Sequence, residues 1–277
     1  LINIKDIDIK YIFYRKNFPR DIPNKYKKKL TNNLNIILND HSVEYVHIVT
    51  PIDSHQNLTN LFLSKNKKIL VEKPLIINNY YIKKFYNYLD NKHKNLVVSY
   101  PYLFSDTLIR AKNIIIKEKI GKLKYITINL NQCGRFMKYD VNELLAPHAI
   151  SILSFFLDVK KIKFSIYNLI KNRRKIETVM ILCLLKNKNI STINLSLNYA
   201  SNKAEKIINL FTESGTISCN LNNNEANIKV YKYKKIKKNN YYIGKTKLIE
   251  NIKFDEKNNM NKVIKSFYQN KKVNTKN

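Results

Sequence analysis

The feature of this sequence that most constrains its fold is a pair of short apolar runs, Val46–Val49 and Ile69–Val71, with a helical pattern between them. Pro51 closely follows the first run and cannot continue a central strand, so the chain must turn there. Ser54 can cap the helix that follows. The apolar positions of that helix recur at helical spacing and are Leu58, Leu61 and Phe62. This order predicts a crossover that joins two parallel strands of one sheet.

Polar residues directly follow both apolar runs. Thr50 and His55 come after the first run, and Glu72 and Lys73 come after the second, just before Pro74. Open parallel sheets bind their ligands at the carboxyl ends of the strands. These side chains are therefore candidates for a ligand site.

Both motifs together resemble the glucose–fructose oxidoreductase/inositol dehydrogenase (Gfo/Idh/MocA) family, because Thr50-Pro51 is followed by His55 and Glu72-Lys73-Pro74 ends the next strand. The resemblance implies an enzyme that transfers a hydride between NAD or NADP and a hydroxyl of a sugar, cyclitol or nucleotide-linked sugar. It implies an α/β fold, with an incomplete Rossmann-like dinucleotide-binding domain over residues 1–101. An α+β domain with a large, mostly antiparallel, open-faced sheet is expected over residues 102–277.

The resemblance also implies a site. Leu-Ala-Pro-His, ending at His148, is similar to the second active-site motif of the family, although Leu144 stands where an acid normally precedes the His. Lys73 and His148 are the implied catalytic residues, one from each domain, and we expect them to face one cleft. An acid/base must reach the reacting hydroxyl, and a nearby cation stabilises its developing charge. The implied cofactor-binding residues are Thr50, Pro51, His55, Glu72, Lys73, Pro74 and Arg15.

The amino-terminal residues predict a strand over Ile7–Tyr14, which in the family is the second strand of the dinucleotide-binding sheet. An acid at its end usually holds the adenosine ribose, whereas this chain has Arg15 and Lys16 there. Cations at this position favour the 2′-phosphate of NADP, although the two residues also fit a lysine-rich loop. No glycine precedes Gly121. Relative to the family pattern, the first strand and its Gly-rich loop are missing, and the sequence is expected to be truncated at both ends.

Other patterns set further expectations. Helices are predicted over 35–39, 78–89, 107–119 and 261–268, and a helix is predicted to start close to His148. The family's Asn and Arg after the strand 96–100 are replaced by Tyr-Pro-Tyr-Leu-Phe. Strands alternate from Glu177 to Asn198, and we expect one of their faces to stay uncovered and to form a homo-oligomer contact. The apolar residues of that face are Val179, Ile181, Ile193 and Leu195.

The charge of the chain does not by itself predict a nucleic-acid partner. Lys and Arg number 51 against 20 Asp and Glu, for a formal charge of +31, but only six are Arg and the lysines are spread along all 277 residues. Abundant Lys, Asn, Ile and Tyr are expected from coding DNA rich in A and T. A nucleic-acid-binding protein concentrates its basic residues on one face. The densest run, Lys232–Lys238, is expected on a solvated strand edge.

Other compositional features exclude some classes. No apolar segment reaches the roughly 18 residues of a membrane span, and the start of the sequence lacks a signal pattern, so a cytoplasmic protein is expected. Cys133, Cys183 and Cys219 show no metal or redox spacing, and we expect no metal. Three functions remain: a family oxidoreductase in partial form, an inactive relative retained for binding, and a basic nucleic-acid-binding protein.

Overall fold

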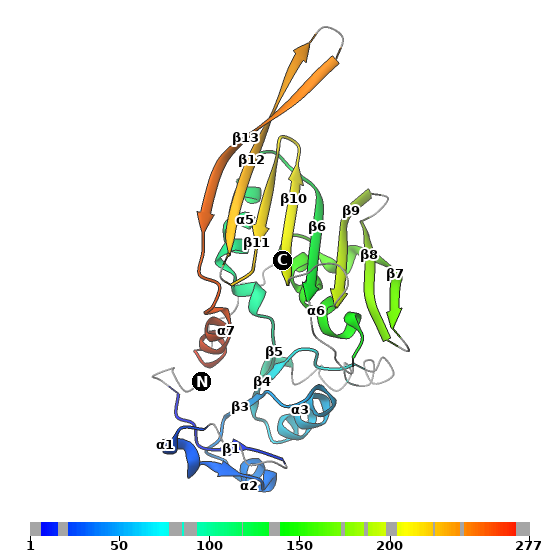
Figure 1. Cartoon of the computed structure of the whole chain (residues 1–277). Coiled ribbons are helices and arrows are strands. Elements are labelled where there is room, and N and C mark those ends of the chain that lie inside the picture. Colours follow the sequence, from blue (N-terminus) through cyan, green and yellow to red (C-terminus); the bar gives the residue numbers. More distant parts are fainter. Residues whose placement is uncertain are drawn as a thin grey trace. The chain divides into compact units, whose positions relative to one another are not determined.

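The computed structural model describes residues 7–15, 22–77, 85, 93–117, 119–132, 139–172, 175–185, 188–197, 204–223, 225–238 and 241–269. The chain divides into two compact units (Figure 1). Leu1–Ser99 and Met260–Lys276 form the first unit, and Tyr100–Asn259 with Asn277 forms the second. Of the helix expected over 78–89, only Phe85 is described, and its side chain is buried.

A three-stranded parallel sheet organises the first unit. Its strands are β3 (Tyr45–Ile48), β4 (Lys68–Glu72) and β5 (Leu96–Ser99), in that order. Helix α3 (His55–Ser64) connects the first two strands, and Ile48 pairs with Val71. The predicted crossover of two neighbouring parallel strands is confirmed. One apolar cluster lies between the sheet and its helices and contains Ile37, Leu38, Ile48, Phe62, Leu63, Ile69 and Val71.

The strand expected over Ile7–Tyr14 is much shorter than predicted. β1 (Ile12–Phe13) pairs in parallel with β2 (Leu30–Thr31) and forms a separate two-stranded sheet. Helices α1 (Asn24–Lys27) and α2 (Leu34–Asn39) lie on either side of β2 in the sequence. Tyr11 and Phe13 still pack against the core of the unit. The alternating pattern therefore predicted these two core contacts correctly, although the strand is shorter than expected and pairs only with β2.

Helix α7 (Asn259–Tyr268) belongs almost entirely to the first unit, whereas the sequence placed it in a domain spanning residues 102–277. The physical reason is its amphipathic face. Val263 and Ile264 are buried, and the Tyr45 ring of β3 lies 5.5 Å from the Phe267 ring between centroids. The functional division at residue 101 stays a prediction.

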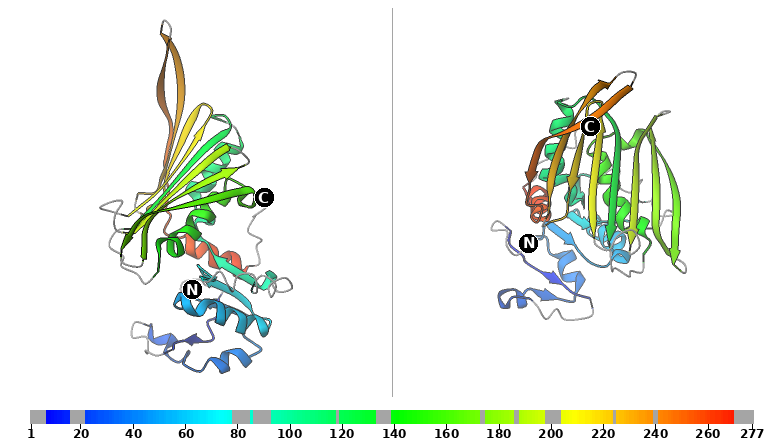
Figure 2. Two further views of the ribbon diagram at one scale, coloured as in Figure 1. Left: turned by 90° about the vertical axis from the view of Figure 1, so that its right-hand side faces the viewer. Right: turned by 45° about the horizontal axis from the view of Figure 1, so that its top comes forward.

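The second unit is built on an eight-stranded sheet (Figures 1 and 2). The strand order is β13-β12-β11-β10-β6-β9-β8-β7, and every neighbouring pair is antiparallel except β6 and β9. This is the predicted α/β fold class, with a Rossmann-like first part and a large, mostly antiparallel sheet. The strands are β6 (Leu123–Gln132), β7 (Ile162–Asn172), β8 (Lys175–Leu185), β9 (Lys188–Leu197), β10 (Glu205–Thr212), β11 (Gly215–Asn220), β12 (Asn227–Lys238) and β13 (Tyr241–Lys253).

The helices of the second unit cover one face of its sheet (Figure 2). α5 (Asp106–Ile116) lies against β11 and β12, and α6 (Val141–Ser154) lies against β6, β8 and β9. The short helices η3 (Pro101–Phe104) and η4 (Val159–Lys161) precede α5 and follow α6. Gly121, after α5, has the expected left-handed backbone, with φ of 82°.

The apolar face that was expected to contact a partner is the face that these helices cover. Val179, Ile181, Ile193 and Leu195 are at most 2% exposed, and α6 lies against both of their strands. That part of the oligomer prediction is wrong. Strand alternation correctly put these residues on one face, but the chain's own helix buries them. The other face carries many Thr and Asn side chains, including a hydrogen bond from Asn194 to Asn129 of 2.8 Å.

The basic run Lys232–Lys238 lies on β12, which has a partner strand on each side at its start. β12 pairs with β11 only as far as Lys232 and then continues beside β13 alone. Figure 1 shows this two-stranded ribbon projecting past the other strands of the sheet. The run is solvated, as Lys232, Lys234 and Lys237 are exposed. Past Lys232 the strand has β13 as its one partner strand among the described residues, so most of the run lies on a solvated strand edge, as expected.

His47 of β3 generates a pH prediction. Burial lowers the pKa of His47 from its usual 6.5 to about 4, and its ring nitrogens form no hydrogen bond to the described part of the chain. Between these two pH values, His47 is therefore protonated in the unfolded chain and neutral in the folded chain. Stability should be full above pH 6.5 and should fall as the pH drops toward 4, by up to about 3 kcal/mol. Urea denaturation at several pH values measures this slope.

The matched variants are His47→Gln and His41→Gln, since His41 is an exposed histidine of the same unit. His47→Gln should flatten the slope between pH 6.5 and 4, and His41→Gln should leave it unchanged. An equal slope in all three proteins would show that another group causes the acid sensitivity.

Candidate active site

The polar residues that follow β3 and β4 meet at one edge of the parallel sheet. Ile48 is paired with Val71, so Thr50 and the segment Glu72–Pro74 leave neighbouring strands at the same end. Thr50, Glu72 and Lys73 are half-buried and Pro74 is buried. The peptide bond between Lys73 and Pro74 is cis. The sequence therefore placed these residues at the correct edge.

His55 joins these two loops through their backbone. It is the first residue of α3 and is only 1% exposed. Its Nδ1 lies 2.9 Å from the Pro74 carbonyl oxygen, and its Nε2 lies 2.7 Å from the Thr50 carbonyl oxygen. A neutral imidazole donates through one nitrogen and an imidazolium through both. Because both nitrogens face carbonyl oxygens, the observed role of His55 is to hold the loops, and its contact with a nicotinamide cofactor stays a prediction.

A pair of hydroxyl groups shapes the first loop. Ser54 Oγ donates to the Pro51 carbonyl oxygen at 2.7 Å and lies 2.6 Å from Thr50 Oγ1. Since Ser54 has a single hydroxyl hydrogen, Thr50 is the donor between the two hydroxyls. The expected helix cap at Ser54 is wrong, because its side chain turns back to Pro51. The short helix η1 (Ile52–Ser54) enters α3 instead. Sequence reasoning missed the hydrogen bond from Ser54 to the Pro51 carbonyl group. The signal available for it was that Ser54 follows Pro51 by three residues.

A second residue that sequence reasoning missed is Ser99, the last residue of β5. Ser99 pairs with Glu72 in the strand register and is fully buried. Its hydroxyl group lies 3.6 Å from the Met260 sulfur of α7, within the first unit. A serine that ends a predicted buried strand beside a candidate loop was the only signal in the sequence.

Arg15 is not joined to this group by a contact in the described part of the chain. It follows β1 and is exposed, and no hydrogen bond or ion pair joins it to the Thr50 and Pro74 loops within the described ranges. Lys16 lies outside those ranges. The structure thus joins Thr50, Pro51, His55 and Glu72–Pro74 in one group, without Arg15 among them.

His148 belongs to the second unit and lies in the middle of α6. The sequence predicted that this helix starts close to His148, but it begins at Val141. The Asp140 N–H donates to the Glu143 carboxylate at 3.0 Å, which is a reciprocal cap of the kind that starts helices. This cap explains the earlier start, with Pro147 lying inside the helix. Lys73 and His148 belong to different units, so their predicted approach to within about 10 Å, needed for one hydroxyl to reach both, stays a prediction.

An aromatic side chain contacts His148 within the second unit. The Tyr102 ring of η3 lies 5.1 Å from the His148 ring between centroids, and the two planes form an angle of 80°. Burial, with a contribution from the negative charge of Glu256, raises the pKa of Tyr102 to about 12. The phenol is therefore neutral at physiological pH. Leu144, at the position of the family's acid, is buried and 6% exposed.

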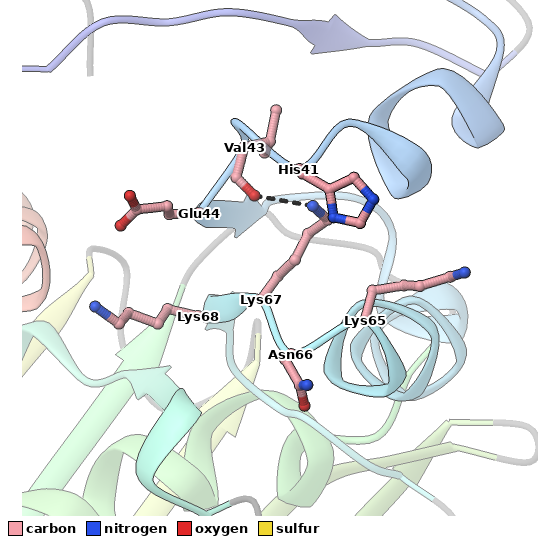
Figure 3. Close-up of a pocket in the computed structure, with 7 residues that line it drawn as sticks. All are labelled: His41, Val43, Glu44, Lys65, Asn66, Lys67 and Lys68. Carbon is pink, nitrogen blue, oxygen red and sulfur yellow. Dashed lines mark hydrogen bonds between the residues drawn. The ribbon is translucent and has the colours of Figure 1, made fainter.

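A small pocket opens at the other end of the parallel sheet (Figure 3). Its volume is 220 Å³, and it is lined by His41, Val43, Glu44, Lys65, Asn66, Lys67 and Lys68. Buried Lys67 donates 2.9 Å hydrogen bonds to the Asp40 and Val43 carbonyl oxygens, and burial lowers its pKa. Lys67 therefore ties two loops together. The pocket lies where β3 and β4 begin, away from the loops of the candidate site.

No group of three or more His, Cys, Asp and Glu side chains within the described ranges is arranged to hold a metal ion. None of the described helices combines the length and the apolar character needed to cross a membrane.

The His55 contacts generate a stability prediction. A neutral His55 donates to one of the two carbonyl oxygens, so His55→Ala leaves at least one carbonyl group without its donor. An unsatisfied buried group costs about 1–3 kcal/mol, and we expect the free energy of unfolding in urea denaturation to fall by about that amount. His41→Ala removes an exposed histidine and should change it by less than about 0.5 kcal/mol. Equal stability of the two variants would contradict the role of His55 in holding the loops.

Comparisons with known proteins agree with the fold of the chain. The sequence model described as the oxidoreductase family, NAD-binding Rossmann fold, matches residues 14–100. No curated protein matches the sequence.

Solved structures share the fold at low identity. A UDP-N-acetylglucosamine 3-dehydrogenase from Acidithiobacillus ferrooxidans is 15% identical over 87% of this chain and 73% of its own, with a TM-score of 0.66. A 3-ketoreductase from Actinomadura kijaniata, in complex with TDP-benzene and NADP, is 11% identical over 87% and 73%, with a TM-score of 0.67. A levoglucosan dehydrogenase in complex with NADH is 16% identical over 79% and 64%, with a TM-score of 0.64.

The match over residues 14–100 and the likeness in fold agree with the motifs at Thr50 and Glu72. The chain resembles the Gfo/Idh/MocA family of NAD(P)-dependent oxidoreductases.

Proposed function

We propose that this chain transfers a hydride between NAD(P) and a hydroxyl-bearing carbon of a sugar, cyclitol or nucleotide-linked sugar. The observation that carries the proposal is the pair of loops at the carboxyl edge of the parallel sheet, held together by His55. The sequence match to an NAD-binding Rossmann fold covers the same residues. Sugar-related names among the similar structures support the substrate class.

The chemistry assigns one role to each half of the site. When the hydroxyl carbon gives up its hydride to the nicotinamide, the hydroxyl oxygen gives up a proton, which a general base must accept. Lys73, in the half-buried turn after β4, is proposed to accept this proton as a neutral amine. The ammonium group that forms then stabilises the negative charge that develops on the oxygen. His148 is proposed to act at the same hydroxyl from the second unit. Thr50, Pro51, Glu72 and Pro74 are proposed to line the cofactor.

Three proposals concern the cofactor and the surroundings. Exposed Arg15 supports a preference for NADP, since a cation can pair with the 2′-phosphate. The two described cysteines, Cys183 and Cys219, are free thiols, which supports a reducing compartment such as the cytoplasm. An inactive relative that only binds a nicotinamide nucleotide is the second candidate, because Leu144 stands where the family has an acid near His148.

Lys73→Ala tests the proposed reaction. The variant should lose turnover by about 10²–10⁴-fold, because the general acid/base is removed. Its affinity for NADPH and NADH, measured by fluorescence titration, should change little. Lys65→Ala removes an exposed lysine of the same unit and should keep full activity.

Two results would contradict the proposal in different ways. Full turnover in Lys73→Ala would rule out the catalytic assignment, while the oxidoreductase function would stand. Nucleotide binding without turnover toward a panel of sugars and nucleotide-linked sugars, in the unmodified chain, would favour the inactive relative. Failure to bind either nucleotide, with salt-dependent binding to DNA, would favour the nucleic-acid-binding alternative, in which the β12–β13 ribbon presents the lysines.

We also propose a homo-oligomer formed through the sheet of the second unit. Since α5 and α6 cover one face, the surface proposed for the contact is the opposite face, where Met180 and Thr192 are half-buried. Light scattering at micromolar concentration should give at least twice the 32.8 kDa mass of one chain. Met180→Lys should lower that mass to one chain, because a charge buried in a sheet contact is costly.

Ile116→Lys is the matched control. Ile116 lies on α5 and is 65% exposed, so this substitution should leave the mass unchanged. A single-chain mass for the unmodified protein would rule the oligomer out.

A further inference from the structure

We infer that Tyr102 is a positioning residue that fixes the orientation of the His148 ring. This inference rests on the proposed function for its catalytic meaning, but the contact itself lies within the second unit. The Tyr102 and His148 rings are 5.1 Å apart between centroids and nearly perpendicular, at 80°. Edge-to-face contacts of this geometry are favourable because the positive edge of one ring meets the negative face of the other. They therefore restrict the ring angle as well as the position.

The sequence around His148 shows why an orienting partner matters here. By resemblance, an acid normally stands at the position of Leu144, and here that side chain is apolar and buried. A leucine has no polar group with which to hold an imidazole. Tyr102 lies in the Tyr-Pro-Tyr-Leu-Phe segment that replaces the family's polar pair. The ring of Tyr102 is thus an observed contact of the His148 ring within the second unit.

The short helix η3 that carries Tyr102 is firmly held. It leads directly into the start of α5, where the Glu256 carboxylate is only 5% exposed. Glu256 accepts hydrogen bonds from Ser105 Oγ at 2.9 Å, from the Thr107 N–H at 3.0 Å and from Thr107 Oγ1 at 2.5 Å. Ser105 and Thr107 are fully buried. A buried carboxylate with several donors resists displacement, so the segment next to Tyr102 has a fixed place.

Tyr102 acts through its ring rather than through proton transfer. Its raised pKa keeps the phenol neutral throughout the physiological range. The Lys206 Nζ lies 6.0 Å from the ring centroid, at the outer limit of a cation–π contact. The aromatic ring is therefore the part of Tyr102 that His148 needs, and a phenylalanine should replace it.

Tyr102→Phe and Tyr102→Leu separate the ring from the hydroxyl group. Carbon-edited NMR of the histidine ring signals, with His148→Gln to assign them, reports the contact without a substrate. Tyr102→Phe should keep the ring-current shift of the His148 signals, and Tyr102→Leu should abolish it. Tyr125→Leu is the matched control, since Tyr125 contacts Phe211 instead and should leave the signals unchanged. Thermal unfolding of each variant checks that it folds.

Activity supplies the second readout. With a turned-over sugar substrate, Tyr102→Leu should lower kcat by about three- to tenfold with little change in the KM for NADPH, and Tyr102→Phe should restore kcat. His148 signals that are identical in folded Tyr102→Leu and in the unmodified chain would overturn the inference. If the chain proves to have no turnover, the proposed function fails, and the NMR shift still decides whether Tyr102 orients His148.

Discussion

The candidate site depends on one buried side chain, His55, which contacts the backbone oxygens of Thr50 and Pro74, two residues that are 24 positions apart in the sequence. Neighbouring parallel strands bring their carboxyl ends together, but they do not define the course of the loops beyond. The imidazole does this from the first turn of α3. His55 therefore couples the start of α3 to the segments that follow β3 and β4.

The second unit supplies its part of the proposed site in a different way. Its helices α5 and α6 cover one face of a large sheet, and His148 projects from the middle of α6 rather than from a loop. Sites on regular elements are held more precisely than sites on loops. The Tyr102 contact adds a further constraint on the imidazole. The residues of the proposed site are thus held in two different ways. In the first unit a side chain contacts the backbone of the loops, and in the second unit helix α6 packs on the sheet.

Local patterns were enough to predict the main architecture. The β3–α3–β4 crossover was predictable because apolar runs flanked by a proline have few alternatives, and Gly121 was predictable because only a few positions need a left-handed backbone. The errors share a cause. The helix was expected to start close to His148, because the Asp140–Glu143 cap that begins it at Val141 was not considered. The face of Val179 and Ile193 looked free, because periodicity shows which residues share a face but not what covers it. Ser54, Ser99 and Tyr102 act through partners that are distant in sequence or through backbone groups, which no local pattern reports.

The Glu256 cluster has a consequence for how the second unit assembles. Its hydrogen bonds to Ser105 and Thr107 span 151 and 149 positions of the chain, and the neighbouring strands β6 and β9 pair in parallel across more than 60 residues. Contacts of such high sequence separation slow folding, because the entropy of closing a long loop is lost before the contact can stabilise the chain. During synthesis, the start of α5 leaves the ribosome well before its carboxylate partner exists. The start of α5 can therefore gain its final hydrogen bonds only after residue 256 has been synthesised.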